Sequence, residues 1–513
     1  MRRPCVYLIG TGPGDPELIT LRGLECLRAA DVVIHDALVS PRLLAQARAG
    51  AELIDVGSAE PGPVAREAIG HLAVEQAREN KIVARLRWGD PFVFGRGAEE
   101  ALFLREHGVP FEVIPGVPAG IGAATYAGIP ATMPGGGDTL TLVRAYGDAG
   151  GGPPAVDWAR VSALGGTVIC YAGAHEMPRV IDALRAAGWP DDGRAALVCD
   201  GTTPRQETIE DTLAALAHRL REHPRHASAV LVLGRVVELR EHLRWFDERP
   251  LFGRRVLVTR PREQAADLAE RLAALGADPV VAPMIRIAPP EDPAPLRRAA
   301  AGAGAFDYII LTSTNAVDAF MSALLEGGRD VRALAGPLLC AVGPGTAGRL
   351  ARYGIRADLV PEEFRAEALL SALLQRGIAP GATVLLPRAD IARDLIAAGL
   401  RQAGAGVTEV VAYRTIADES VRDGGEPDVY RMLLDGRLDA VTFTSASAIR
   451  SFARAFGEEQ AADLLAHTVV ATIGPVAAEA ARRLGITVTV QPAASTIAAL
   501  VDAIAAHFAG APR

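Results

Sequence analysis

The sequence predicts an α/β protein with more than one domain. Its 513 residues exceed what one hydrophobic core usually holds, and half of them are apolar. Short apolar runs of strand length alternate with segments of helical apolar spacing, such as residues 64–79, and this alternation is typical of a mainly parallel sheet. The second half of the chain also repeats itself, which indicates two similar α/β lobes.

The first half contains two groups of predicted strands. The first group, with helices between its members, comprises residues 5–10, 31–35, 52–56 and 82–86. After a glycine-rich break at 134–137, the second group comprises residues 139–145, 167–171, 195–199 and 229–233. Residues 244–253 have the character of a linker, and a new strand at 255–260 follows at once. The chain is therefore expected to divide near residue 250.

The internal repeat consists of two pairs of segments. Residues 310–317 are echoed by residues 442–449, and residues 342–347 are echoed by residues 473–478 at nearly the same offset. Each copy continues through a helix, a glycine, a strand and a proline. Duplicated α/β units predict two lobes with a binding cleft between them.

Composition limits the class of protein. The net charge of −8 argues against a nucleic-acid surface, and no apolar run is long and uncharged enough to span a bilayer. The basic start leads directly into a short strand rather than a signal peptide, so we expect a cytoplasmic protein. The five cysteines are scattered without metal-ligand spacing, so we expect reduced core residues and no metal site.

Two loops rich in glycine and proline are the strongest local signal. Residues 6–10 form a buried strand that runs into Gly12-Pro13-Gly14-Asp15, and Gly89-Asp90-Pro91 opens a second such loop. Loops of this kind hold ligands through backbone groups. A nicotinamide-binding fingerprint is disfavoured because its third glycine would fall on Asp15, while a simple strand–helix turn remains open for a single loop.

Further segments follow in a characteristic order: 36–40, 89–97, 114–117, 126–130 and 201–206. With them, residues 5–246 resemble the S-adenosylmethionine-dependent tetrapyrrole methyltransferases, above all the uroporphyrinogen-III C-methyltransferases. The resemblance implies a two-subdomain methylase fold over residues 1–246 with S-adenosylmethionine bound between the subdomains. It also implies methylation of uroporphyrinogen III at C2 and then C7, giving precorrin-2 on the way to sirohaem or cobalamin.

The resemblance assigns roles residue by residue. Arg96 and Glu99 carry over as catalytic or substrate-binding residues, although a solvated Arg and a helix N-terminal Glu would explain them equally well without the family. The residues implied to bind the cofactor are Gly12, Pro13, Gly14, Gly89, Asp90, Pro91, Tyr171, Ala172, Thr202 and Thr203.

The chain departs from the family pattern in several loops. Trp88 stands where the family has glycine, and the other departures are at 57–63, 118–120, 133–135 and Ala172. A bulky residue at a position of close backbone approach, together with fewer basic residues, would weaken binding of a substrate with eight carboxylates. The alternative is therefore a degenerate, non-catalytic methyltransferase-like module for binding or dimerisation.

The second half resembles the uroporphyrinogen-III synthases over residues 254–508, after a linker at 247–253. The resemblance rests on segments at 258–261, 386–390 and 411–415 and on the paired loops of the repeat. It implies a bilobal fold with two similar parallel-sheet lobes. Lobe A would comprise 254–287 and 416–508, and lobe B would comprise 290–411. It also implies closure of hydroxymethylbilane to uroporphyrinogen III with inversion of ring D and without a cofactor.

In this resemblance Tyr413 is the catalytic candidate, because the substrate hydroxyl must leave as water and a nearby donor assists it. Without the family, Tyr413 would be a half-buried aromatic residue at a strand end. The implied substrate-binding residues are Ser313, Asn315, Thr346, Ser445 and Ser447. Their loops start helices, so simple N-capping also accounts for the hydroxyls. Ala477 stands where the family often has threonine.

Together the two resemblances predict a bifunctional enzyme of tetrapyrrole biosynthesis, a methyltransferase joined to a synthase (a lyase). The expected partners are tetrapyrrole substrates, with no nucleic acid and no membrane, and a homodimer through the methyltransferase domain.

Overall fold

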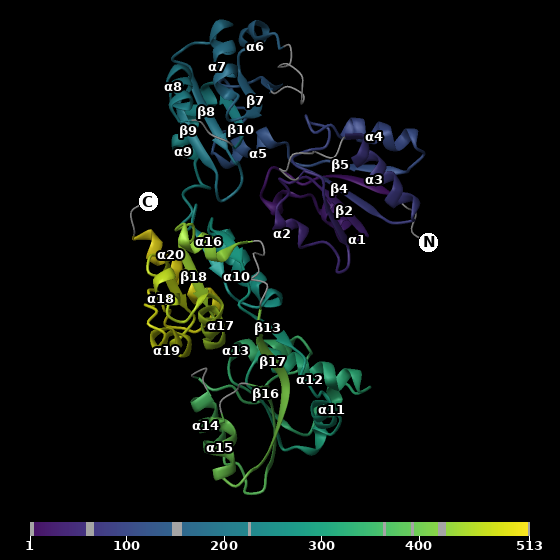
Figure 1. Cartoon of the computed structure of the whole chain (residues 1–513), viewed down its shortest axis with the longest axis vertical. Helices are drawn as coiled ribbons and strands as arrows, with labels where there is room; N and C mark the ends of the chain where they lie inside the picture. The colour runs from purple at the N-terminus through teal and green to yellow at the C-terminus, as the bar shows by residue number, and fades with distance from the viewer. Residues whose placement is uncertain are drawn as a thin grey trace. The chain divides into compact units, whose positions relative to one another are not determined.

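The computed structural model describes residues 5–57, 66–145, 156–223, 227–362, 366–390, 394–418 and 427–510. The chain forms two compact units, Met1–Gly253 and Arg254–Arg513 (Figure 1). Of the loop at 57–63 only Gly57 lies among the described residues. No helix in the described part of the chain combines the length and apolar character that a membrane crossing requires.

The first sheet of unit 1 is entirely parallel, in the order β3-β2-β4-β1-β5. Its strands are β1 (Val6–Gly10), β2 (Val32–His35), β3 (Glu52–Asp55), β4 (Val83–Arg87) and β5 (Phe111–Ile114). Its helices are α1 (Leu21–Ala29), α2 (Pro41–Leu44), α3 (Arg66–Arg78) and α4 (Gly97–Glu106). The four strands and the helix expected here are confirmed. β5 was not predicted, because it is a short edge strand in which only Ile114 is buried.

The second sheet of unit 1 is mixed, in the order β6-β7-β10-β8-β9, and only β6 and β7 pair parallel. Its strands are β6 (Leu140–Arg144), β7 (Thr167–Gly173), β8 (Arg194–Cys199), β9 (Glu207–Thr212) and β10 (Ser228–Leu233). Its helices are α5 (Ala119–Tyr126), α6 (Trp158–Leu164), α7 (Met177–Ala186), α8 (Leu213–Glu222) and α9 (Arg240–Leu243). The four predicted strands are confirmed. β9 was not predicted, because it is a polar edge strand with one buried residue, Ile209.

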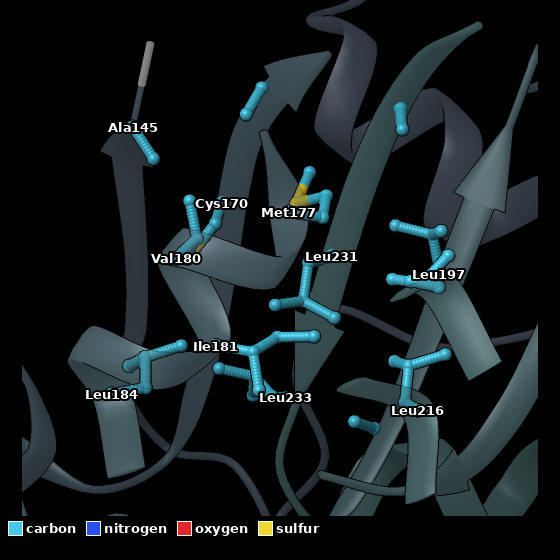
Figure 2. Packing of buried hydrophobic residues seen from close by; sticks show 14 of the residues in the cluster. Ala145, Cys170, Met177, Val180, Ile181, Leu184, Leu197, Leu216, Leu231 and Leu233 are labelled. Carbon is cyan, nitrogen blue, oxygen red and sulfur yellow. The ribbon is translucent and has the colours of Figure 1, made fainter. Parts of the chain in front are cut away.

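One core of this sheet lies between its strands and helices α7 and α8. Figure 2 shows Met177, Ile181 and Leu184 of α7 pointing toward Leu231 and Leu233 of β10. The buried residues of α7 are apolar and recur every three or four positions in the sequence, so they form one buried stripe along the helix. This packing fixes β7 and β10, whose ends carry loops of the candidate site.

Unit 2 contains two sheets. The sheet of lobe A is parallel, in the order β12-β11-β18-β19. Its strands are β11 (Arg255–Val258), β12 (Asp278–Val281), β18 (Ala440–Phe443) and β19 (Val469–Thr472). Its helices are α10 (Arg262–Ala274), α16 (Val429–Leu434), α17 (Ala446–Phe456), α18 (Ala461–Leu464), α19 (Pro475–Arg483) and α20 (Ile497–Ala509). Fully buried Leu257 and Val441 from neighbouring strands lie in one core with Phe452 of α17.

The sheet of lobe B has the order β13-β17-β16-β14-β15, parallel except for β13 with β17. Its strands are β13 (Ile285–Ala288), β14 (Tyr308–Leu311), β15 (Leu338–Ala341), β16 (Thr383–Ala389) and β17 (Gly406–Ala417). Its helices are α11 (Ala294–Ala301), α12 (Thr314–Glu326), α13 (Pro344–Ala351), α14 (Ala366–Gln375) and α15 (Leu395–Gln402).

The two segments that cross between the lobes pair with each other. Ile285 is opposite Ala417 in the antiparallel β13–β17 ladder, and β17 appears in Figure 1 as a long strand beside β16. Residues 285–287 and 416–417 therefore lie in the sheet of lobe B, not in lobe A as expected. The reason is that two crossing segments running in opposite directions satisfy each other's backbone groups by continuing one ladder.

The internal repeat is confirmed as a structural repeat. Ser313 caps α12 by accepting from Ala316 N at 3.1 Å, and Ser445 caps α17 by accepting from Ala448 N at 3.2 Å. In both lobes a second parallel strand then leads through a Gly-Pro pair into a helix, α13 or α19. The two lobes thus present equivalent helix N-termini at the carboxyl ends of their parallel strands.

Leu231→Ala should lower the free energy of unfolding of unit 1 by about 2–5 kcal/mol, because Leu231 is fully buried in the centre of its sheet. All four tryptophans (Trp88, Trp158, Trp189 and Trp245) lie in unit 1, so tryptophan fluorescence during urea unfolding reports this unit alone. Leu164→Ala, at a position 62% exposed, should change stability by less than about 0.5 kcal/mol. Equal effects of the two substitutions would contradict this placement of the core.

Candidate active sites

In unit 1 the loops that follow β1, β4 and β5 are in direct backbone contact. Gly12 N donates to Gly89 O at 3.1 Å, and Gly89 N donates to Gly12 O at 2.8 Å. A Cβ built on Gly10 would lie 2.5 Å from Gly116 N, which no side chain tolerates. The carboxyl end of a parallel sheet is where ligands bind in α/β folds, and glycines here let three loops converge.

Asp90 connects two of these loops. Its Oδ1 accepts from Phe92 N at 2.8 Å, and its Oδ2 accepts from Gly116 N at 2.9 Å. The carboxylate is 9% exposed and therefore makes charge-assisted hydrogen bonds in a shielded place. Asp90, which the sequence places in the cofactor loop, thus holds the loops in register.

The loop at 200–206, which follows β8 of the second sheet, contacts the loop at 12–15, which follows β1 of the first sheet. Thr202 Oγ1 accepts from Asp15 N at 3.1 Å, and the Tyr126 hydroxyl donates to Asp15 Oδ2 at 2.9 Å. A Cβ built on Gly14 would lie 2.7 Å from Cγ2 of Thr203. The predicted residues Gly14, Thr202 and Thr203 are therefore brought together.

Tyr171, at the end of β7, forms part of the wall between the sheets. Its hydroxyl accepts from Gly120 N at 2.9 Å, and its ring lies 5.0 Å from the ring of Phe94. A Cβ on Gly120 would come within 2.7 Å of the Tyr171 hydroxyl, so the tyrosine fits here beside a glycine. Ala172 follows in the same strand, where it is buried in the core on the opposite face.

A small pocket lies among these loops. It is lined by Pro13, Trp88, Ala119, Ala123, Val198, Gly201, Ser228, Ala229 and Val230. Most of these side chains are apolar, and two of the lining residues, Pro13 and Gly201, belong to the predicted loops. Trp88 forms one wall, so its indole limits the size of the pocket.

Backbone strain is concentrated around the same loops. Five non-glycine residues in the described part of the chain have positive φ angles, and four of them are Phe94, Arg96, Asp200 and Thr202. A non-glycine residue in this region is disfavoured by about 1 kcal/mol or more and persists only where its surroundings enforce it. Strain of this kind is typical of ligand-binding loops, so it independently marks the loops at 90–97 and 200–206.

The predicted catalytic pair occupies the start of α4. Arg96 is the N-cap of this helix and is half-buried, while Glu99 is exposed in the first turn, where Glu99 N donates to Arg96 O at 3.1 Å. No hydrogen bond or ion pair joins their two side chains among those described.

A charge cluster that sequence reasoning missed lies next to this helix. Arg85 of β4, 1% exposed, donates to Asp36 Oδ1 at 2.7 Å and to Glu100 Oε1 at 3.2 Å. Burial alone would lower the pKa of Arg85, but the charges of Glu100 and Asp36 outweigh it and raise the pKa. Arg87 contacts the same two carboxylates. The available signal was an arginine inside a buried strand, because such a charge requires a partner.

In unit 2, three of the predicted residues are brought together in lobe B. Ser313 Oγ and the Tyr413 hydroxyl oxygen form a hydrogen bond at 3.0 Å, and Asn315 also bonds to this hydroxyl. Burial raises the pKa of Tyr413 above its ordinary value, while the hydrogen bonds from Ser313 and Asn315 partly oppose the shift. Tyr413 therefore keeps its proton at neutral pH and can act as a donor.

The remaining predicted residues lie at other helix N-termini. Ser445 and Ser447 form a hydrogen bond at 3.0 Å at the start of α17, in lobe A. Thr346 is buried in the first turn of α13, and Ala477 is buried at the equivalent place in α19. Ser313 and Ser445 act as helix N-caps, which confirms the structural explanation of these hydroxyls and leaves ligand binding as a proposal.

Two further residues, missed by sequence reasoning, extend the Tyr413 cluster. Gln264 Nε2 donates to Asn315 Oδ1 at 2.5 Å, and Arg260 Nη2 donates to Gln264 Oε1 at 3.2 Å. Both residues belong to lobe A, at the end of β11 and the start of α10. The sequence signal was the arginine directly after a buried strand, in the segment 258–261 that had been matched only as a motif.

Comparison with known proteins agrees with this geometry. Residues 5–217 match the family model of the tetrapyrrole (corrin/porphyrin) methylases, and residues 266–502 match that of the uroporphyrinogen-III synthase HemD. The porphyrin biosynthesis protein HemD of Ruminiclostridium josui is 35% identical over 503 residues, which cover 98% of both chains. The chain belongs to this fused family of tetrapyrrole methylases and uroporphyrinogen-III synthases.

Two further proteins are similar to part of this chain. The uroporphyrinogen-III C-methyltransferase of Bacillus subtilis is 33% identical over 66% of this chain and 70% of its own. The crystal structure of a Thermus thermophilus uroporphyrin-III C-methyltransferase complexed with S-adenyl homocysteine is 35% identical, with a TM-score of 0.40, over 46% of this chain and 99% of its own. The chain is thus an enzyme of tetrapyrrole biosynthesis that joins a methyltransferase to a synthase.

Asp90→Asn should lower the free energy of unfolding of unit 1 by about 1–3 kcal/mol, because an amide NH₂ would face one of the two backbone N–H groups that the carboxylate now accepts. Urea unfolding followed by tryptophan fluorescence measures the change. Asp192→Asn is the matched control, since Asp192 is exposed in the same unit, and its stability should equal that of the wild type. An unchanged stability of Asp90→Asn would contradict the connecting role of Asp90.

Proposed function

We propose that the chain catalyses two consecutive steps of tetrapyrrole biosynthesis. Unit 2 closes hydroxymethylbilane to uroporphyrinogen III with inversion of ring D. Unit 1 then methylates uroporphyrinogen III at C2 and C7 to give precorrin-2. The observation that carries the proposal is the full-length match to a porphyrin biosynthesis protein, supported by a mostly apolar pocket among the loops of unit 1 and a buried tyrosine donor in unit 2.

The residues of unit 1 fit S-adenosylmethionine as the cofactor. The pocket bordered by Pro13, Trp88 and Gly201 is mostly apolar, as an adenine ring requires, and the surrounding loops supply backbone polar groups. When bound, S-adenosylmethionine supplies a methyl group on an electrophilic sulfonium. The loops around Gly12 and Gly89 would hold it, and close positioning contributes most of the catalysis because the methyl donor is already activated.

In unit 1 the cationic residue near the loops is assigned to the substrate. Arg96 is held at the N-cap of α4 in a strained conformation and would bind a carboxylate of uroporphyrinogen III. Glu99, exposed one turn into the helix, would assist removal of the pyrrole proton after methyl transfer. Both assignments are carried over from the family resemblance.

In unit 2 we assign the proton donor to Tyr413. The hydroxyl group of hydroxymethylbilane must leave as water before the ring closes, and a donated proton or hydrogen bond lowers the barrier to this step. Tyr413 is buried and protonated, and Ser313 and Asn315 fix its hydroxyl in place. The helix N-termini at Ser313, Thr346 and Ser445 would hold acetate and propionate carboxylates.

One incubation tests both activities. The purified full-length chain is mixed with fresh hydroxymethylbilane and S-adenosylmethionine, and the products are resolved by isomer and by mass. Dimethylated type-III product is expected. Unmethylated type-III product would restrict the function to the synthase and would favour a non-catalytic methyltransferase-like module, for which a homodimer in light scattering would be the expected property. The absence of any type-III product would contradict the proposal.

Trp88→Gly should bind S-adenosylmethionine about tenfold more tightly than the wild type, because removing the indole widens the pocket. Trp88→Phe keeps a smaller ring, so its affinity for S-adenosylmethionine should lie between those of the wild type and Trp88→Gly. Isothermal titration calorimetry measures the three dissociation constants. Equal constants would show that Trp88 does not restrict the cofactor, and no binding by any of the three would favour the non-catalytic module.

Tyr413→Phe should lower the synthase kcat by about 100-fold, because only the donor hydroxyl is removed. Since burial raises the pKa of Tyr413 above 10, the proton is present below that value and is lost only above the raised pKa. The ratio of wild-type to variant rates should therefore stay constant between about pH 7 and about pH 9.

The matched control is Tyr353→Phe, which removes a tyrosine hydroxyl that donates to Asp318 Oδ1 at 3.1 Å in the same lobe. Its synthase rate should equal that of the wild type. Unchanged turnover of Tyr413→Phe would remove Tyr413 from the mechanism.

A further inference from the structure

Among the described residues, Arg260 is a cation with no counter-charge in contact with it. It follows β11 directly, at the carboxyl end of the parallel sheet of lobe A, and is half-buried. Its Nε is shielded from solvent and has no hydrogen-bond partner, and its guanidinium makes no ion pair within the described residues. Burial lowers the pKa of Arg260, and the more distant charge of Asp267 only partly opposes the shift.

The two fully buried arginines in the described part of the chain are paired. Arg85 contacts Asp36 and Glu100, and Arg240 contacts Glu210 and Asp247. An unpaired buried charge is unfavourable, and proteins retain one mainly where a ligand completes the pair. Arg260 therefore differs in kind from the structural arginines.

Arg260 is also part of the hydrogen-bonded chain that ends at Tyr413. Arg260 Nη2 donates to Gln264 Oε1, Gln264 Nε2 donates to Asn315 Oδ1, and Asn315 bonds to the Tyr413 hydroxyl. Since Arg260 and Gln264 lie in lobe A while Asn315 and Tyr413 lie in lobe B, the chain of contacts runs from one lobe to the other. A group bound by Arg260 would lie near the proposed proton donor.

We propose that Arg260 binds one carboxylate of the linear tetrapyrrole substrate and so anchors it in lobe A beside Tyr413. The inference rests on the proposed synthase function and adds a residue that binds the substrate. A guanidinium offers a planar fork of N–H groups that matches a carboxylate, and Nε is the member of this fork that has no partner. A local cation also explains how a chain of net charge −8 holds a polyanion.

The test uses three variants of the full-length chain. Arg260→Gln removes the charge, and Arg260→Lys keeps the charge without the fork. Arg262→Gln is the matched control, because Arg262 is exposed two residues further along, at the start of α10. For each variant we would measure the synthase kcat and KM for hydroxymethylbilane, and the Kd for uroporphyrin III, an unreactive octacarboxylate, by fluorescence titration.

Arg260→Gln should raise both KM and Kd about tenfold and leave kcat within about twofold, as expected when one interaction with the substrate is removed. Arg260→Lys should recover part of the affinity, and Arg262→Gln should match the wild type. The Kd of Arg260→Gln should also depend less steeply on salt than that of the wild type, because one charge pair is gone.

Unchanged KM and Kd in Arg260→Gln would overturn the inference, as would an equal rise in Arg262→Gln. A lowered melting temperature with unchanged Kd would assign Arg260 to stability through Gln264 and would also overturn it. The uroporphyrin titration separates the two proposals. Weakened binding by Arg260→Gln, in a protein whose wild type forms no type-III product, would support the carboxylate site and reject the synthase function.

Discussion

Backbone segments that approach one another at the carboxyl ends of parallel strands are the constraint on which unit 1 depends. Gly10, Gly89 and Gly116 come so close that a Cβ on Gly10 or Gly116 would overlap the neighbouring backbone, and Asp90 then fixes the loops by accepting from two N–H groups. Because the loops are held by backbone contacts, the side chains around them are free to vary. This explains how a side chain as large as that of Trp88 can line the pocket without disturbing the loops.

Whether a buried arginine has a carboxylate partner distinguishes arginines that stabilise the fold from arginines that are candidates for binding a ligand. In unit 1 the cation of Arg85 is matched by Asp36 and Glu100, and that of Arg240 by Glu210 and Asp247. In unit 2 the guanidinium of Arg260 makes no ion pair with the residues that the structure describes, and its Nε has no hydrogen-bond partner there. The free energy of leaving a buried charge unpaired is large, so this difference separates an arginine that completes the fold from one that can receive an anion.

The two lobes of unit 2 share the same arrangement of strands and helix N-termini but carry different polar side chains. Each lobe presents a serine cap and a Gly-Pro helix start at the carboxyl ends of its strands. Lobe B adds Tyr413 from the crossing strand β17, and lobe A adds Arg260 and Gln264 after β11. The helix N-termini are equivalent in the two lobes, whereas the proposed proton donor lies in lobe B and the arginine with no ion pair among the described residues lies in lobe A. Substrate orientation and catalysis would thus be divided between the lobes.

The sequence by itself determined the α/β class, most strands, the duplication and the family of each half, because these depend on apolar runs, spacing and loop motifs that are local. It did not predict β5 and β9, which are edge strands with one buried residue each and which form only because a neighbouring strand supplies a ladder. It placed the lobe boundary a few residues away from the β13–β17 pair for the same reason. The partners of Arg85 and the chain from Arg260 to Tyr413 were decided by tertiary structure alone, since they join residues far apart in sequence whose pairing depends on how strands and helices pack.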